Sequence, residues 1–453
     1  MIRRAGALAA VTLTVLAVAG PSAGAITPPE VDAAAAPPPG SAGPVQPMAQ
    51  RSECTASGVI PGSDPGAAGP NQLSLSLSES WRHNRGDGQL VAVIDTGVRP
   101  GPLLNVEAGG DFVEATDGLT DCDGHGTLVA GLIAGQPGSD GFSGVAPGAR
   151  IVSIRQTSAR FAPRNPGDDP VATQATIDVA TLARAVVRAA DLGARVINIS
   201  AVTCIPANKN IDQSQLGAAL RYASVDKDVV IVAAAGDTHG ASACESNPLT
   251  DPARPSDPRN WSSVTSVAIP SWWQQYVLSV GSVTVGGQPS RFTMAGPWVG
   301  VAAPGENITS VSNGADGGLA NGMPDSEQEM SPISGTGYAA AYVSGVAALV
   351  RSRFPELSAA QVVNRITATA HSAARSPSNL VGAGTVDPVA ALTWQVPAEV
   401  EIGPPAVRQT AAPPTPQPED PTPRVFAFTG LGVLAAAVLA ALVVSAKRKD
   451  KTS

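Results

Sequence analysis

The sequence predicts an α/β fold, a mainly parallel sheet with helices on both faces, followed by a C-terminal transmembrane helix. Short apolar runs recur along the middle of the chain, as expected of strands that are buried on both faces. Helical segments alternate with these runs, and this alternation favours parallel strands joined by crossover helices. A separate apolar run near the C-terminus predicts the membrane helix.

Five apolar runs predict the strands: Leu90–Ile94, Ala149–Ile154, Val196–Ile199, Val229–Ala234 and Val277–Val280. Apolar residues at helical spacing predict a helix over Thr176–Leu192. The small, apolar segment Ala339–Phe354 predicts a buried central helix. Ser358 and Gln361 have the spacing of a capping box, which predicts the start of a helix that runs to about residue 369.

The length, charge and residue content of the chain exclude several classes of function. The 453 residues suffice for one large domain or two smaller ones, and the net charge is −8. The mild acidity argues against nucleic acid as a partner, because no basic patch is available to contact phosphates. No acidic loop has a convincing calcium-ligand pattern, so we expect no metal and no cofactor.

The N-terminus, residues 1–25, is typical of a secretory signal peptide. Arg3 and Arg4 precede a short apolar run, Ala7–Ala19, and Ala23-Gly24-Ala25 forms a small-residue cleavage site. Export also permits disulfides. The four cysteines, Cys54, Cys122, Cys204 and Cys244, allow three pairings, and their spacing does not choose among them. Zinc is a weaker alternative because no C-x-x-C pair exists.

The apolar run near the C-terminus spans residues 425–446 and contains no charge. As a helix it would be roughly 33 Å long, enough to cross a bilayer. Four cations follow within the tail, residues 447–453, and positive residues favour the cytoplasmic side. The pattern therefore predicts a single-pass protein of the cell membrane whose globular part is extracytoplasmic.

Three further segments lie between these ends. Residues 26–72 are rich in Pro, Ala, Gly and Ser and predict an extended arm, partly tied to the main domain through Cys54. Residues 73–394 predict the globular body. Residues 395–424 form a Pro-rich linker that favours extended polyproline conformations.

Two polar residues stand out within the body. Asp95 ends an apolar strand, where open α/β sheets place functional groups. His125 lies between two glycines just before a helical segment, a setting that none of the other three histidines shares. A buried carboxylate can orient an imidazole and stabilise its charged form, so the two residues are candidate catalytic partners.

The order of three motifs resembles the subtilisin superfamily: Asp95-Thr96-Gly97, then His125-Gly126-Thr127, then Gly335-Thr336-Gly337-Tyr338-Ala339-Ala340. The likeness extends over about residues 75–392. Residues 144–149 resemble the entry to a core strand, and residues 196–200 resemble the substrate-pairing edge, which ends at Ser200. Residues 233–237 resemble the oxyanion-hole segment, which ends at Asp237, and residues 301–305 resemble a stretch late in the fold. The resemblance implies a subtilisin-like serine endopeptidase fold with Ser200 at the substrate.

The flanking segments narrow the resemblance to the mycosins, the membrane-anchored S8 serine proteases of type VII secretion systems. It implies partners in the secretion membrane complex and extended peptide segments in the cleft. It also implies the disulfides Cys54–Cys122 and Cys204–Cys244.

Two positions depart from the family pattern. Gly337 replaces the nucleophilic serine, so no acyl-enzyme can form there. Asp237 replaces the asparagine that donates to the oxyanion, and an ionised carboxylate only accepts hydrogen bonds. In subtilisin, losing that donor costs about 2.7–4 kcal/mol, and losing the nucleophile costs about 10⁶ in turnover.

Three functions remain open at this point. The sequence favours a proteolytically silent protein with a structural role in the secretion complex. The first alternative is an active serine endopeptidase that uses another nucleophile, such as the hydroxyl of Ser334 or Thr336, or a water-based route. The second is a pseudoprotease whose cleft binds extended peptides by strand addition.

Overall fold

The structure is a computed structural model that describes residues 26–138, 140–239, 244–249, 251, 253–254, 256–373, 376–397 and 422–449. The predicted signal peptide, residues 398–421 of the linker and residues 450–453 of the tail lie outside the described residues. The chain divides into two units, residues 1–400 and 401–453, each of which is described by itself.

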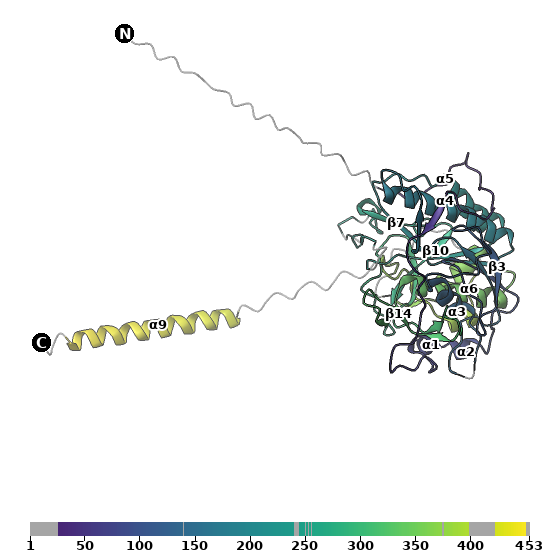
Figure 1. Cartoon of the computed structure of the whole chain (residues 1–453). Coiled ribbons are helices and arrows are strands. Elements are labelled where there is room, and N and C mark those ends of the chain that lie inside the picture. Colours follow the sequence, from purple (N-terminus) through teal and green to yellow (C-terminus); the bar gives the residue numbers. More distant parts are fainter. Residues whose placement is uncertain are drawn as a thin grey trace, which may run out of the picture. The chain divides into compact units, whose positions relative to one another are not determined.

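A sheet of nine strands forms the centre of the first unit in the described part of the chain (Figure 1). Its pairs are parallel except for the antiparallel pair at one edge. In spatial order the strands are β16 (His371–Ser372), β17 (Gly384–Thr385), β11 (Val299–Pro304), β10 (Val277–Val283), β8 (Val230–Ala234), β6 (Val196–Ile199), β2 (Leu90–Asp95), β4 (Arg150–Arg155) and β3 (Val106–Asp111).

The five strands predicted from apolar runs are all present, as β2, β4, β6, β8 and β10. The other four strands of the sheet, β3, β11, β16 and β17, were not predicted from apolar runs. The first half of β3 is exposed or half-buried and its second half contains two glycines, so its sequence lacks a continuous apolar pattern. β11 includes residues 301–304 of the late stretch that resembles the subtilisin superfamily.

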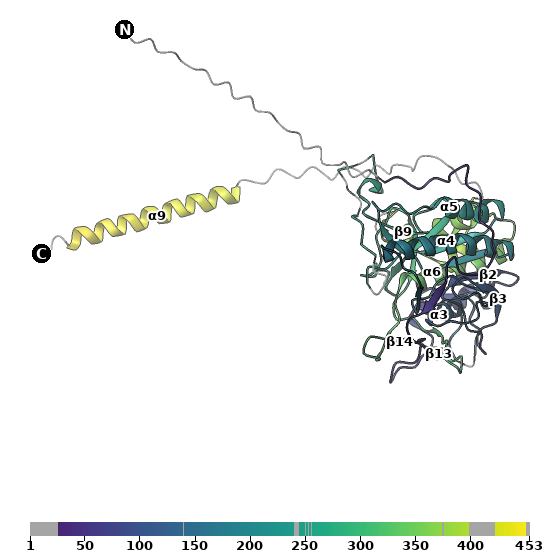
Figure 2. The same cartoon turned by 45° about the horizontal axis from the view of Figure 1, so that its top comes forward.

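Helices cover both faces of the sheet, as predicted (Figure 2). Strand residues alternate between two cores: Val91 and Val93 join the first, Ala92 and Ile94 the second. The first core contains α3 (His125–Ala134), α6 (Thr336–Arg353), α7 (Ala359–Ala368) and α8 (Pro388–Thr393). The second contains α4 (Pro170–Asp191) and α5 (Ser214–Arg221). The capping box at Ser358 and Gln361 is also confirmed.

Smaller elements surround the sheet. Four antiparallel pairs join β1 (Met48–Gln50) to β5 (Phe161–Pro163), β7 (Thr203–Pro206) to β9 (Ser266–Ile269), β12 (Ser310–Val311) to β13 (Leu319–Ala320), and β14 (Gly322–Pro324) to β15 (Met330–Pro332). The short helices are α1 (Pro70–Ser74), α2 (Leu77–Ser80), η1 (Tyr222–Asp226) and η2 (Trp261–Ser263).

The arm is fastened to the body by backbone pairing and by a covalent bond. Strand β1 pairs with β5, and Gly58 pairs with Gly322 further along. The disulfides are Cys54–Cys122 and Cys204–Cys244, which confirms the pairing that the resemblance implies and leaves no cysteine free for zinc.

The second unit contains α9, Thr422–Lys449, which covers the predicted membrane segment. Within the described residues, no helix reaches the length and apolarity that a membrane crossing needs. The prediction of a transmembrane helix over residues 425–446 is therefore not confirmed.

Candidate active site

Asp95 and His125 meet as the sequence predicts. Asp95 is the last residue of β2 and is fully buried, and His125 is the first residue of α3. The imidazole Nδ1 lies 2.7 Å from Asp95 Oδ1, which also accepts the backbone N–H of Thr96 at 2.8 Å. A Cβ at Gly126 would clash with the carbonyl oxygen of Gly97, so only glycine lets α3 start this close to β2.

The environment of His125 favours its charged form. Burial lowers the pKa of the ring, but the negative charges of Asp95, Asp121 and Asp123 outweigh burial and raise that pKa to about 9. The imidazole is therefore protonated at neutral pH. Asp95 thus both orients the ring and stabilises its charged form, which is the relation expected of a catalytic pair.

Gly337 lies directly in front of the imidazole. A Cβ at this position would be 3.1 Å from His125 Nε2 and 3.1 Å from both Cβ and the carbonyl oxygen of Ser200. Residue 337 thus occupies the place of a nucleophile beside a base, but it carries no side chain. The surrounding atoms also stand closer than most side chains tolerate, so a serine would push its neighbours back by a few tenths of an ångström.

Asp237 turns its carboxylate toward the start of α6. Its Oδ1 accepts the backbone N–H of Thr336 at 2.9 Å, and a Cβ at Gly335 would lie 3.2 Å from its Oδ2. Burial raises the pKa of this carboxyl, while Thr336 and the positive His125 partly offset the effect. The position expected to supply an amide donor instead supplies an acceptor that is already engaged.

Ser200 joins the end of β6 to α6. Its hydroxyl accepts a hydrogen bond from Asn198 Nδ2 at 2.7 Å and donates to the carbonyl oxygen of Gly337 at 2.9 Å. Ser344, on α6, donates to Asn198 Oδ1 at 2.8 Å. This network holds the cleft wall against the helix that bears residue 337. The expected substrate contact of Ser200 stays a prediction.

The two hydroxyls considered as replacement nucleophiles are engaged elsewhere. Ser334 is exposed and its Oγ accepts the backbone N–H of Asn307 at 3.3 Å. Thr336 Oγ1 accepts the backbone N–H of Gly236 at 3.2 Å. Among the described residues, no hydroxyl forms a hydrogen bond with His125 Nε2. Neither Ser334 nor Thr336 therefore stands in hydrogen-bond contact with the imidazole.

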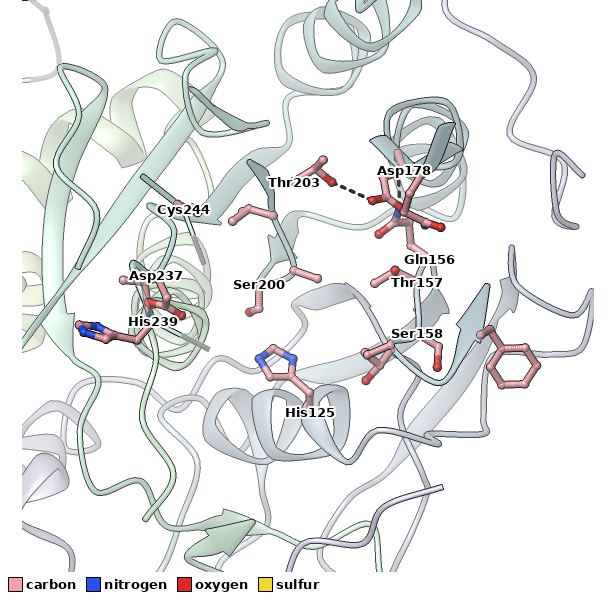
Figure 3. Close-up of a pocket in the computed structure, with 17 residues that line it drawn as sticks. His125, Gln156, Thr157, Ser158, Asp178, Ser200, Thr203, Asp237, His239 and Cys244 are labelled. Atoms are coloured by element: carbon pink, nitrogen blue, oxygen red, sulfur yellow. Dashed lines mark hydrogen bonds between the residues drawn. The ribbon is translucent and has the colours of Figure 1, made fainter. Parts of the chain in front are cut away.

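A cleft of about 530 Å³ opens beside His125 (Figure 3). Two segments that follow parallel strands form its walls: residues 156–159 after β4 and residues 200–203 after β6. Its remaining lining residues are Thr96, His125, Phe161, Gln174, Asp178, Asp237, His239, Cys244 and Thr336. No cluster of metal-binding side chains occurs in the part of the chain that the structure describes.

Sequence reasoning missed three residues around this site. The Tyr338 ring lies 5.0 Å from the His125 ring, between centroids. The buried Asp121 accepts hydrogen bonds from Thr96 and Thr127, and burial raises its pKa to about 6. Asp178 enters the cleft from α4. Tyr338 and Asp121 stand in or beside quoted motifs, but Asp178 has no local sequence signal.

Comparison with known proteins shows the family of this chain. The model of the subtilase family matches residues 86–384. Mycosin-3 of Mycobacterium tuberculosis is 62% identical over 461 residues, and the match covers 100% of both chains. The chain belongs to the mycosins.

Solved mycosin structures share the fold. The structure of MycP3 protease from the type VII (ESX-3) secretion system is 71% identical, with a TM-score of 0.80, and covers 82% of this chain and 100% of its own. A chain in the structure of an intact ESX-5 inner membrane complex is 47% identical, with a TM-score of 0.80, and the match covers 92% of this chain and 100% of that one. Mycosin-1 of Mycolicibacterium smegmatis is 47% identical over 413 residues, 89% of this mycosin and 91% of that one.

Proposed function

We propose that this mycosin is proteolytically silent and serves as a structural component of a type VII secretion membrane complex. The observation that carries the proposal is the absence of a side chain at residue 337, in front of His125 Nε2. A second feature supports it: Asp237 presents a hydrogen-bond acceptor where an oxyanion requires a donor.

The structural role is supported by relatives found in assemblies. Similar chains occur in the intact ESX-5 inner membrane complex and in the periplasmic assembly of that complex. An extracytoplasmic globular unit fits such a position. We retain the segment 425–446 as the proposed membrane anchor, because it is uncharged and precedes a basic tail.

Two variants distinguish a structural role in the complex from a role in proteolysis. We expect that deleting residues 73–394 lowers the yield of the purified membrane complex, whereas His125→Ala leaves both yield and secretion unchanged. Inhibitor-sensitive cleavage by the unmodified protein, abolished by His125→Ala, would overturn the proposal. A complex that assembles fully without the globular unit would also overturn it.

Peptide binding is a second candidate role that the cleft favours. Ala201 and Val202 follow β6 along one wall, and within the described residues their backbone groups form no hydrogen bond. Such an unpaired edge is suited to strand addition by an extended peptide. Binding of this kind needs neither a nucleophile nor an oxyanion donor, so the two altered positions do not prevent it.

A further inference from the structure

Asp178 is a carboxylate in the cleft wall without a cation beside it. It lies on α4, and Figure 3 shows it near Gln156 and Thr203, away from His125 and Asp237. Its Oδ1 accepts Gln174 Nε2 at 2.8 Å, and its Oδ2 accepts Thr203 Oγ1 at 3.2 Å. Among the described residues, none of the Lys, Arg or His side chains forms an ion pair with it.

The charge of Asp178 is costly where it stands. Burial raises the pKa of this carboxyl to about 6, even though Gln174 and Thr203 lower it. The group is still mainly ionised at pH 7.5, but it has lost much of its hydration. Its two hydrogen bonds do not explain the charge, because an asparagine amide could satisfy both partners.

The other charged groups of the cleft, unlike Asp178, have a group of opposite charge nearby. His125 pairs with Asp95, and its positive charge also acts on Asp237, so that end of the cleft already contains both signs. His239 lines the cleft on the side of Asp237 (Figure 3). Asp178 is thus the carboxylate that a positive group from outside would complement.

We propose that the cleft binds an extended peptide segment through one Lys or Arg side chain whose cationic head reaches Asp178. The proposal rests on the peptide-binding role and adds the chemistry of the ligand. Side chains of an extended segment alternate, so the backbone can pair with the Ala201–Val202 edge while one side chain enters the cleft. The long apolar stems of Lys and Arg can lie along the wall while the head meets the carboxylate.

Binding of designed peptides to the full mature chain in detergent tests this chemistry. The probes are fluorescent, end-blocked alanine hexapeptides with a single Lys at each position in turn, and the matched probes carry norleucine instead. At pH 7.5 we expect Lys to be preferred about tenfold at one position, which is about 1.4 kcal/mol. Fluorescence anisotropy gives the Kd.

Variants assign the preference to Asp178. Asp178→Asn should abolish the Lys preference while the norleucine peptides bind as before. Asp168→Asn, at an exposed aspartate ten positions earlier, removes the same charge outside the cleft and should change nothing. Thermal unfolding of each variant shows that its fold is intact.

The outcomes distinguish the two proposals. Equal binding of Lys and norleucine peptides at every position would overturn the role of Asp178 and leave peptide binding in place. A Lys preference that persists in Asp178→Asn would likewise overturn it. If no peptide binds, the peptide-binding role and the inference both fall.

Discussion

Asp237 and Thr336 are joined by a hydrogen bond of 2.9 Å from the backbone N–H of Thr336 to the carboxylate Oδ1. The bond satisfies a free N–H at the first turn of α6, where the helix dipole favours a negative charge. The aspartate therefore caps the start of the helix, at the position where the resemblance to the subtilisins predicts an oxyanion donor.

Restoring catalysis should require both altered positions. Gly337→Ser alone supplies a nucleophile beside His125 but leaves a carboxylate facing the developing oxyanion. Gly337→Ser combined with Asp237→Asn should give measurable acylation by an active-serine probe, with a pH optimum shifted toward 9 because His125 must lose its proton. Intact-mass measurement of the labelled protein between pH 6 and 10 checks this. Equal labelling of the single and double variants would contradict it.

Asp237 should respond differently to two substitutions. Asp237→Asn keeps an oxygen that can accept the N–H of Thr336, and it removes a carboxylate whose pKa is raised by burial. The free energy of unfolding of this variant at pH 7.5 should therefore equal or exceed that of the wild type. Asp237→Ala leaves the N–H of Thr336 without that acceptor and should lower the free energy of unfolding by about 1 kcal/mol. Urea unfolding measures both. An alanine variant as stable as the asparagine variant would refute the capping role.

The stability of the fold should fall in alkaline solution because of His125. Its pKa is raised from 6.5 to about 9 in the folded state, so its contribution is complete below pH 6.5 and is lost as pH rises through 9. The loss should be on the order of 2 kcal/mol. Unfolding at pH 7 and pH 10 should show this loss in the wild type and a smaller one in His125→Gln. The exposed His239→Gln variant serves as control.

Removal of either disulfide should destabilise the first unit. The bridges close loops of 68 and 40 residues, and the chain-entropy model gives roughly 4 kcal/mol for each. Paired Cys→Ala variants, Cys54 with Cys122 and Cys204 with Cys244, should both show lowered unfolding midpoints. A midpoint unchanged in either pair would show that packing alone holds that segment.

The proposed anchor is tested by truncation. A chain that ends at Arg424 lacks the uncharged segment 425–446 and should stay in the supernatant when membranes are sedimented. The full chain should sediment with them and resist extraction by carbonate. If the truncated chain still sediments completely, another part of the protein contacts the membrane.

The sequence predicted the fold best in segments that are buried along their whole length. The strands β2, β4, β6, β8 and β10 were predicted because parallel strands covered on both faces require apolar residues at every position. The Asp95–His125 pair was predictable for a related reason, because strand ends and glycine-flanked helix starts bring polar groups together.

Other features depend on contacts between distant segments and had no local signal. The half-exposed β3 lacks an apolar run, and β1 is short and pairs with β5 across more than a hundred residues. Asp178 enters the cleft only because α4 packs beside residues 200–203. The close approach of His125 Nε2 to residue 337 is a matter of tenths of an ångström, which no motif specifies.

The bond between Cys54 and Cys122 changes what a cut in the arm would do. Residues 61–64 are exposed and lie between the two cysteines, so a protease that cleaved there would leave two pieces still joined covalently. A nicked molecule would migrate as one species on a non-reducing gel and as two after reduction. Scission of the arm and its release are therefore separate events in this protein.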